Sequence, residues 1–309
     1  MKAAATEATS AWRAWTISLR LQTLPLACCG ILLGSALAVA SGATPDRAVF
    51  ALALITAVLL QLLANLANDY GDFSKSADTS ARLGPQRGMQ MGMISLAQMR
   101  RALWFTATLC LLAGGALLTI ACRSTTDMLV FLGLGKVSII AALTYTLGRH
   151  AYGYLGLGDL SVLVFFGLVA VGGSYYLQTG RIDPHVTVPA IGCGLLSVLV
   201  LNVNNMRDMD EDRKHGKITL AIRLGARRAR YYHLLVLLAG LGALAWTAWH
   251  SGQGRLAPWG FLLMAPLAVS HASTMLHYAK AEELRAQLPV SVSLNILSIG
   301  LLALDLIFR

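Results

Sequence analysis

The chain has 309 residues, of which 56% are hydrophobic and only 13% are charged. A soluble domain usually carries about 25% charged residues, so this composition excludes an ordinary soluble globular protein and favours one whose solvent is lipid. The formal net charge of +10 needs no nucleic-acid partner, because membrane proteins gather Lys and Arg in cytoplasmic loops for topological reasons.

Apolar runs recur along the whole chain, and no Pro/Ser-rich or low-complexity linker separates them. A membrane-spanning helix needs about 20 mostly apolar residues, and nine segments meet this requirement. The sequence therefore predicts an all-α, polytopic membrane protein with a single domain, residues 1–309. The predicted spans are residues 22–42, 48–68, 102–121, 127–147, 158–178, 187–206, 231–250, 257–278 and 288–308.

The first 21 residues differ from the predicted spans. Basic side chains interrupt Trp12, Trp15 and Leu19, and there is no short apolar core with a small-residue cleavage site, as a signal peptide would have. We expect residues 1–21 to form an amphipathic leader helix at the membrane interface.

The distribution of basic residues predicts the orientation. Most Lys and Arg residues lie in the leader and in the loops on the same side of the membrane, which places the N-terminus in the cytoplasm. We expect a multi-pass protein of the cytoplasmic (inner) membrane, in contact with membrane lipid. The exceptions are Lys136, inside a predicted helix, and Arg47, Arg123, Arg181, Arg255 and Arg309 on the other side.

A first polar cluster begins while the second predicted helix is still running. Its four residues lie at i, i+3, i+4 and i+7, so their side chains share one helix face. Carboxylates at this spacing repel each other unless a cation or a donor lies between them. The following loop adds Arg82 and Arg87. The cluster consists of Asn65, Asn68, Asp69 and Asp72.

A second polar cluster follows the sixth predicted helix, on the same side of the membrane. Asn204, Asp208 and Asp212 lie at i, i+4 and i+8 and form another single stripe. Both clusters are therefore expected to face one cavity. Polar and basic neighbours of this stripe are Asn205, Arg207 and Lys217.

The loop between the fourth and fifth predicted helices contributes Tyr145 and Arg149. Their i, i+4 spacing would place them on one face, where they would line the cavity between the clusters. The alternative is an interfacial aromatic residue beside an Arg that serves topology.

Carboxylate and amide oxygens with no nearby Cys or His favour a hard cation, and Mg²⁺ commonly binds one or two carboxylates together with substrate phosphates. Arginines beside the acids can donate to the remaining phosphate oxygens. The pattern indicates an Mg²⁺-dependent site for a lipid diphosphate.

These motifs together resemble the UbiA superfamily of intramembrane aromatic prenyltransferases. The resemblance rests on Asn68-Asp69-x-x-Asp72, Arg82 with Gly84-Pro85-x-Arg87-Gly88, Tyr145-x-x-x-Arg149 and Asn204-x-x-x-Asp208-x-x-x-Asp212. Two positions depart from the family pattern. Ser76 stands where many members have a further acid, with Asp78 the next acid along, and Arg149 stands where many have Lys.

The resemblance implies nine helices around a central cavity and an allylic polyprenyl diphosphate as the prenyl donor. It is greatest to members that prenylate 1,4-dihydroxy-2-naphthoate with loss of CO₂, giving demethylmenaquinone in menaquinone biosynthesis. An acceptor such as 4-hydroxybenzoate, or a non-catalytic carrier of polyprenyl phosphates, remains an alternative. The sequence leaves prenyl chain length and oligomeric state open.

The resemblance also implies residue roles. Asp69 and Asp72, with Asn68, would hold one Mg²⁺, and Asp208 and Asp212, with Asn204, a second. Tyr145 and Arg149 join the four aspartates as catalytic candidates, and Arg20 would pair with the acceptor carboxylate or serve topology. The full set of candidate substrate-binding residues is Arg20, Asn65, Asn68, Arg82, Arg87, Asp159, Asn204, Asn205, Arg207 and Lys217.

Overall fold

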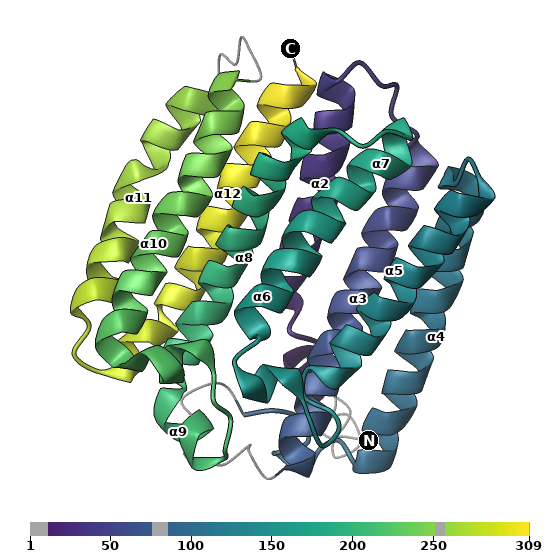
Figure 1. Ribbon diagram of the computed structural model, residues 1–309. Helices are drawn as coiled ribbons and strands as arrows, with labels where there is room; N and C mark the ends of the chain where they lie inside the picture. Colours follow the sequence, from purple (N-terminus) through teal and green to yellow (C-terminus); the bar gives the residue numbers. More distant parts are fainter. Residues whose placement is uncertain (1–11, 76–85, 251–256, 309) are drawn as a thin grey trace, which may run out of the picture.

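A computed structural model describes residues 12–75, 86–250 and 257–308. These ranges form helices joined by short turns and contain no strand, which confirms the all-α prediction. Figure 1 shows long helices standing side by side, with the C-terminus at one end of the bundle and α9 at the other. The predicted single-domain organisation and the orientation in the membrane stay predictions.

Every predicted span coincides with helix within these ranges. The principal elements are α2 (Leu24–Ala40), α3 (Arg47–Ser74), α4 (Leu96–Ala121), α5 (Thr125–Thr144), α6 (Gly158–Val162), η3 (Leu163–Gly172), α7 (Gly173–Thr179), α8 (Thr187–Arg207), α9 (Met209–Lys214), α10 (Leu220–His250), α11 (Ala257–His277) and α12 (Gln287–Ile307). Short 3₁₀ turns are η1 (Leu21–Thr23), η2 (Tyr152–Leu155), η4 (Pro184–Val186) and η5 (Ala281–Arg285).

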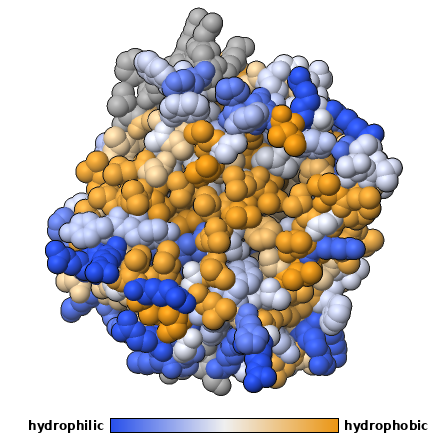
Figure 2. Space-filling model, viewed as in Figure 1, coloured by the Kyte–Doolittle hydropathy of each residue, from blue (hydrophilic) through white to orange (hydrophobic). Residues whose placement is uncertain are grey.

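Among the described residues, eight helical stretches are long and apolar enough to cross a membrane. The expected span at 257–278 forms α11, which is helical but is not one of the eight, so eight rather than nine candidate spans are found by length and composition. In Figure 2 apolar side chains cover the middle of the visible face, and polar side chains gather toward both ends of it, including the end where α9 lies. A belt of this kind suits contact with lipid.

The leader begins as a helix in the described part of the chain, from Trp12 to Leu19. Ala14 is fully buried, and Trp15 and Leu19 pack against the same apolar cluster, which joins α3 and α4. The described part of the leader therefore packs on the protein, and its place at the membrane interface stays a prediction.

The helices form two groups, seen in Figure 1 as α3 to α5 on one side and α8 with α10 to α12 on the other. The leader, α3, α4 and α5 share one apolar cluster. A larger cluster joins α2, η3, α8, α10, α11 and α12. The two groups meet along α2, α3 and η3, which positions the space between them for a ligand.

A glycine allows α2 to approach the fifth span closely. A Cβ at Gly34 would lie 2.2 Å from Ser174 Oγ and 2.3 Å from the carbonyl oxygen of Val171, both much closer than van der Waals contact. Only glycine permits this approach. In the same span η3 is a π-helix, a widened form that often occurs at functional sites.

A buried chain of polar side chains crosses the larger group. His233 Nδ1 lies 2.9 Å from Asn202 Oδ1, the Nε2 atoms of His233 and His271 lie 2.9 Å apart, and His271 Nδ1 lies 2.7 Å from Gln287 Oε1. Both imidazoles are essentially inaccessible. Because buried polar groups are costly unless they are paired, this chain fixes α8 against α10, α11 and α12.

Replacing His271 with leucine should destabilise the fold by roughly 1–3 kcal/mol, because it leaves a buried nitrogen of His233 and the Gln287 amide without this partner. Thermal unfolding in detergent measures the effect. His277→Leu is the matched control, since His277 is exposed and its Nδ1 pairs with the Ser273 carbonyl on its own helix. Equal melting temperatures for the two variants would contradict the prediction.

Candidate active site

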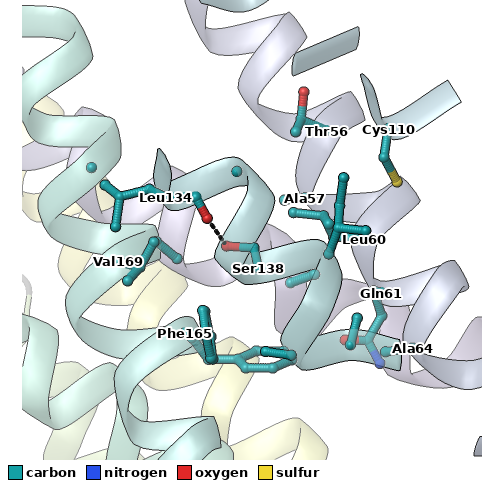
Figure 3. Close-up of a pocket in the computed structure, with 18 of the residues that line it drawn as sticks. Thr56, Ala57, Leu60, Gln61, Ala64, Cys110, Leu134, Ser138, Phe165 and Val169 are labelled. Atoms are coloured by element: carbon teal, nitrogen blue, oxygen red, sulfur yellow. Dashed lines mark hydrogen bonds between the residues drawn. The ribbon is translucent and has the colours of Figure 1, made fainter. Parts of the chain in front are cut away.

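A cavity with a volume of about 430 Å³ lies between the two helix groups. Its walls are mostly apolar and come from α2, α3, α4, α5, η3 and α8. Figure 3 shows Leu60 and Gln61 of α3, Ser138 of α5 and Phe165 of η3 on these walls. The candidate residues on its lining are Arg20, Asn65, Asn68, Tyr145 and Asn204.

The first acidic cluster lies on α3 as the spacing predicts, because α3 continues as a helix to Ser74. Asp69 is completely buried and Asp72 nearly so. Arg20 Nη2 donates to Asp69 Oδ1 at 2.7 Å, and Arg87 Nη1 lies 2.8 Å from Asp72 Oδ2 and 3.2 Å from Asp69 Oδ1. Guanidinium groups therefore neutralise the carboxylates that would otherwise repel each other.

A strained turn brings Arg20 to Asp69. Arg20 adopts the left-handed conformation, with φ 50° and ψ 53°, which is uncommon for a residue with a side chain. Asn65 stabilises the turn by donating from Nδ2 to the Leu19 carbonyl at 2.9 Å and to Thr23 Oγ1 at 3.4 Å. Asn65 thus holds the backbone that presents Arg20, a contact that the sequence does not reveal. Strain of this kind often occurs at functional sites.

Gly71 lets α3 pack tightly against the loop after α5. A Cβ there would lie 2.6 Å from Thr146 Oγ1 and 2.9 Å from the Thr146 carbonyl carbon. Thr146 Oγ1 donates to the Ala67 carbonyl at 2.8 Å and to Asn68 Oδ1 at 3.3 Å. The loop therefore fixes the amide of Asn68 beside the acids.

The second acidic cluster lies at the end of α8. Asp208 interrupts the regular helix between α8 and α9, but its backbone N–H still bonds to Asn204 and its carbonyl accepts from Asp212. Arg207 forms a buried bidentate pair with Asp208, with both distances 2.7 Å. Lys217 Nζ lies 3.3 Å from Asp212 Oδ1. The predicted stripe of Asn204, Asp208 and Asp212 thus keeps its i, i+4 backbone bonds, although the regular helix is interrupted at Asp208.

Tyr154 connects the two clusters, although the motif spacings did not select it. Its hydroxyl donates to Asp72 Oδ1 at 2.8 Å, and its ring lies under Lys75. Burial and the neighbouring Asp72 carboxylate raise the pKa of the Tyr154 phenol well above its usual range, so the hydroxyl stays protonated and donates. In the sequence Tyr154 lies in the stretch 152–159, which follows Tyr145 and Arg149.

The predicted shared face of Tyr145 and Arg149 is wrong, because α5 ends at Thr144 and Gly148 adopts a positive φ. Tyr145 reaches the cavity, where its ring meets that of Tyr152 edge-on at 5.3 Å, whereas Arg149 is exposed and is not on the lining. Lys136 also lines the cavity.

Three further candidates lie away from the cavity lining. Asp159 is buried and accepts a hydrogen bond from the Tyr232 hydroxyl at 3.1 Å, and Asn205 is buried in α8. Arg207 is occupied by Asp208. Arg82 and Asp78 fall in residues 76–85, outside the described residues.

The helical bundle and its paired acidic motifs define an intramembrane prenyltransferase, and the comparisons agree. Residues 27–298 match the UbiA prenyltransferase family. The chain belongs to this family, as the motifs predict.

Curated relatives share much of the sequence. The chain is 52% identical over 263 residues to 1,4-dihydroxy-2-naphthoate octaprenyltransferase of Escherichia coli strain K12, a match that covers 84% of each chain. It is 46% identical over 297 residues to the enzyme of that name from Haemophilus influenzae, a match that covers 93% of this chain and 95% of the relative.

Solved structures share the fold at low sequence identity. A UbiA homologue from Aeropyrum pernix K1 without ligand superimposes with a TM-score of 0.66 at 18% identity, covering 94% of this chain and 98% of that one. A UbiA homologue from Archaeoglobus fulgidus bound to GPP and Mg²⁺ gives a TM-score of 0.56 at 15% identity, covering 96% and 100%.

Replacing Gly71 with alanine should lower both turnover and stability, the latter by about 1–3 kcal/mol, because the new methyl group forces α3 away from Thr146. Product formation per folded protein and thermal unfolding measure the two effects. Gly133→Ala is the control, since a Cβ at that α5 position would meet nothing within 4 Å in the described part of the chain outside the neighbouring backbone of its own helix. Unchanged turnover in Gly71→Ala would show that this close packing does not position the site.

Proposed function

We propose that the chain transfers a polyprenyl group from an allylic polyprenyl diphosphate to 1,4-dihydroxy-2-naphthoate, releasing diphosphate and CO₂. The observation that carries the proposal is a mostly apolar cavity whose polar lining includes Arg20 and Asn68, directly beside the buried acids of the first cluster. The names of relatives at 46% and 52% identity support the acceptor.

Mg²⁺ fits the chemistry of the acidic clusters. Asp69 Oδ2 is buried and has no hydrogen-bond partner within the described ranges, so a hard oxygen ligand is available beside Asn68. No group of three or more His, Cys, Asp and Glu side chains in those ranges could hold a metal by itself. Mg²⁺ usually binds one or two carboxylates and completes its coordination with substrate phosphates, so it does not need three ligating side chains at one point.

The residues proposed to hold Mg²⁺ are Asp69 and Asp72 with Asn68, and Asp208 and Asp212 with Asn204. When bound, the metal would supply positive charge that stabilises the diphosphate as a leaving group. The Archaeoglobus fulgidus homologue, which was solved with GPP and Mg²⁺ bound, supports this use of a divalent cation.

The chain's own cations would bind the departing diphosphate. Negative charge accumulates on it as the C–O bond breaks, so donors that bind it more tightly at that stage lower the barrier. Arg87 and Arg20 lie beside the first cluster, and Lys217 beside the second. The apolar cavity would exclude water from the allylic cation until the electron-rich ring attacks it.

The cavity wall between α5 and the fifth span is thin. A shallow groove on the outer surface there shares Ala141, Tyr152, Ser161 and Phe165 with the cavity lining. In a membrane this surface would face lipid, which supports entry of a long prenyl chain from the side. The basic residues at the α9 end support a site on the cytoplasmic side of the inner membrane.

Purified protein with Mg²⁺ and a polyprenyl diphosphate should convert 1,4-dihydroxy-2-naphthoate into a prenylated, decarboxylated product, detected by mass. Adding EDTA should abolish the reaction, and 4-hydroxybenzoate in place of the naphthoate is the comparison. If only 4-hydroxybenzoate is prenylated, the acceptor is not the naphthoate. If the polyprenyl diphosphate binds without being consumed, the protein is a carrier and not an enzyme.

Replacing Asp69 with asparagine should lower turnover at least about 100-fold, because it removes a carboxylate proposed to hold Mg²⁺ and unbalances Arg20 and Arg87. The variant also loses a buried ion pair, so product is measured per folded protein after gel filtration. Asp127→Asn is the control, because Asp127 bonds to Tyr176 away from the cavity. Retained turnover in Asp69→Asn would overturn the assignment.

A further inference from the structure

Three segments that are distant in sequence meet at Tyr154. The first is the end of α3, with Asp72 and Lys75. The second is η2, which contains Tyr154 itself. The third is the turn after α9, where Lys217 pairs with Asp212. The first acidic cluster therefore contacts the Tyr154 side chain directly through Asp72, and the second reaches it through Lys217.

Contacts on the α3 side use both parts of the tyrosine. The hydroxyl donates to Asp72 Oδ1 at 2.8 Å, while Arg87 Nη1 lies 2.8 Å from the other oxygen of the same carboxylate. Asp72 is thereby held from two sides, which fixes its rotation. Lys75 Nζ lies 4.0 Å from the centre of the Tyr154 ring, a distance at which an ammonium group is attracted to the ring face.

Contacts on the α9 side use the backbone and the ring. The Tyr154 carbonyl accepts from the Ile218 N–H at 3.0 Å, which fixes the residue next to Lys217. Lys217 Nζ lies 5.9 Å from the ring centre and 3.3 Å from Asp212 Oδ1. One residue further, the Leu155 carbonyl accepts from Arg223 at 3.0 Å. The turn after α9 and the first part of α10 are therefore both bound to η2.

We propose that Tyr154 is a positioning residue that aligns the two acidic clusters: its hydroxyl orients Asp72, its ring supports Lys75, and its backbone holds the turn that carries Lys217. This inference rests on the proposed function, because the ligand that the aligned clusters receive is a magnesium diphosphate. Residues that orient ligating carboxylates matter because their loss typically costs about 10–100-fold in metal affinity or activity.

Tyr154→Phe tests the hydroxyl alone, since the ring and the backbone remain. We expect the Mg²⁺ concentration for half-maximal turnover to rise about 10-fold or more, with little change in the KM for the naphthoate, because the role proposed for Asp72 is to hold Mg²⁺ and not the acceptor. A merely structural role would lower the yield of folded protein without shifting the Mg²⁺ dependence.

Tyr176→Phe is the matched control. Tyr176 is also half-buried, and its hydroxyl also donates to an aspartate, Asp127, at 2.8 Å, but the pair lies away from the cavity lining. Removing this hydroxyl should leave the Mg²⁺ dependence unchanged. If the two variants shift the Mg²⁺ dependence equally, or neither shifts it, the proposal is wrong.

A binding measurement separates this inference from the proposed reaction. Mg²⁺ with inorganic diphosphate should raise the melting temperature of the wild-type protein and of Tyr176→Phe, and should raise that of Tyr154→Phe much less. This pattern would support alignment by Tyr154 even if the naphthoate were not prenylated. Equal stabilisation of all three proteins, or of none, would overturn it.

Coupling between the clusters is tested by combining substitutions. Lys217→Met and Tyr154→Leu should each weaken diphosphate binding. The fold-loss in affinity of the double variant should be smaller than the product of the two single fold-losses, because both substitutions disturb the same connection. Lys214→Met is the control partner, since Lys214 is exposed and pairs with Glu211. If the losses of affinity caused by Lys217→Met and Tyr154→Leu multiply in the double variant, the two residues are not coupled through the ring.

Discussion

The arrangement of the site depends on the neutralisation of buried carboxylates at the end of a membrane helix. Asp69 and Asp72 lie one turn apart on α3 and are almost inaccessible, so both cannot stay charged without cations beside them. Arg20 comes from before α2 and Arg87 from the loop before α4, and both reach these acids. The ion pairs thus connect the leader, α3 and the following loop into one unit.

The same requirement explains several local features that are far apart in the sequence. The left-handed turn at Arg20 is retained because it aims the guanidinium at Asp69, and Asn65 holds that turn through the Leu19 carbonyl. Gly71 keeps α3 close enough for Thr146 to bond to Asn68. Buried polar groups in a membrane protein are costly unless each is satisfied, so these features are mutually dependent.

The two helix groups have different tasks. The group of α8, α10, α11 and α12 is fixed by a large apolar cluster and by the chain from Asn202 through His233 and His271 to Gln287. This group presents Asn204 and Asp208 at the end of α8. The arginine-paired acids of α3 belong to the other group, and Tyr154 lies where the two groups meet at the polar end.

The sequence by itself determined the helical segments and the stripe on α3, because hydrophobic length and helical spacing are local properties of the chain. It also placed both acidic clusters at one end of the bundle. Only the tertiary structure decided which cation pairs with which acid, since Arg20 and Asp69 are 49 positions apart. It also separated Arg149 from Tyr145 and brought Tyr154 to Asp72, because turns and long-range packing set these contacts and no local periodicity encodes them.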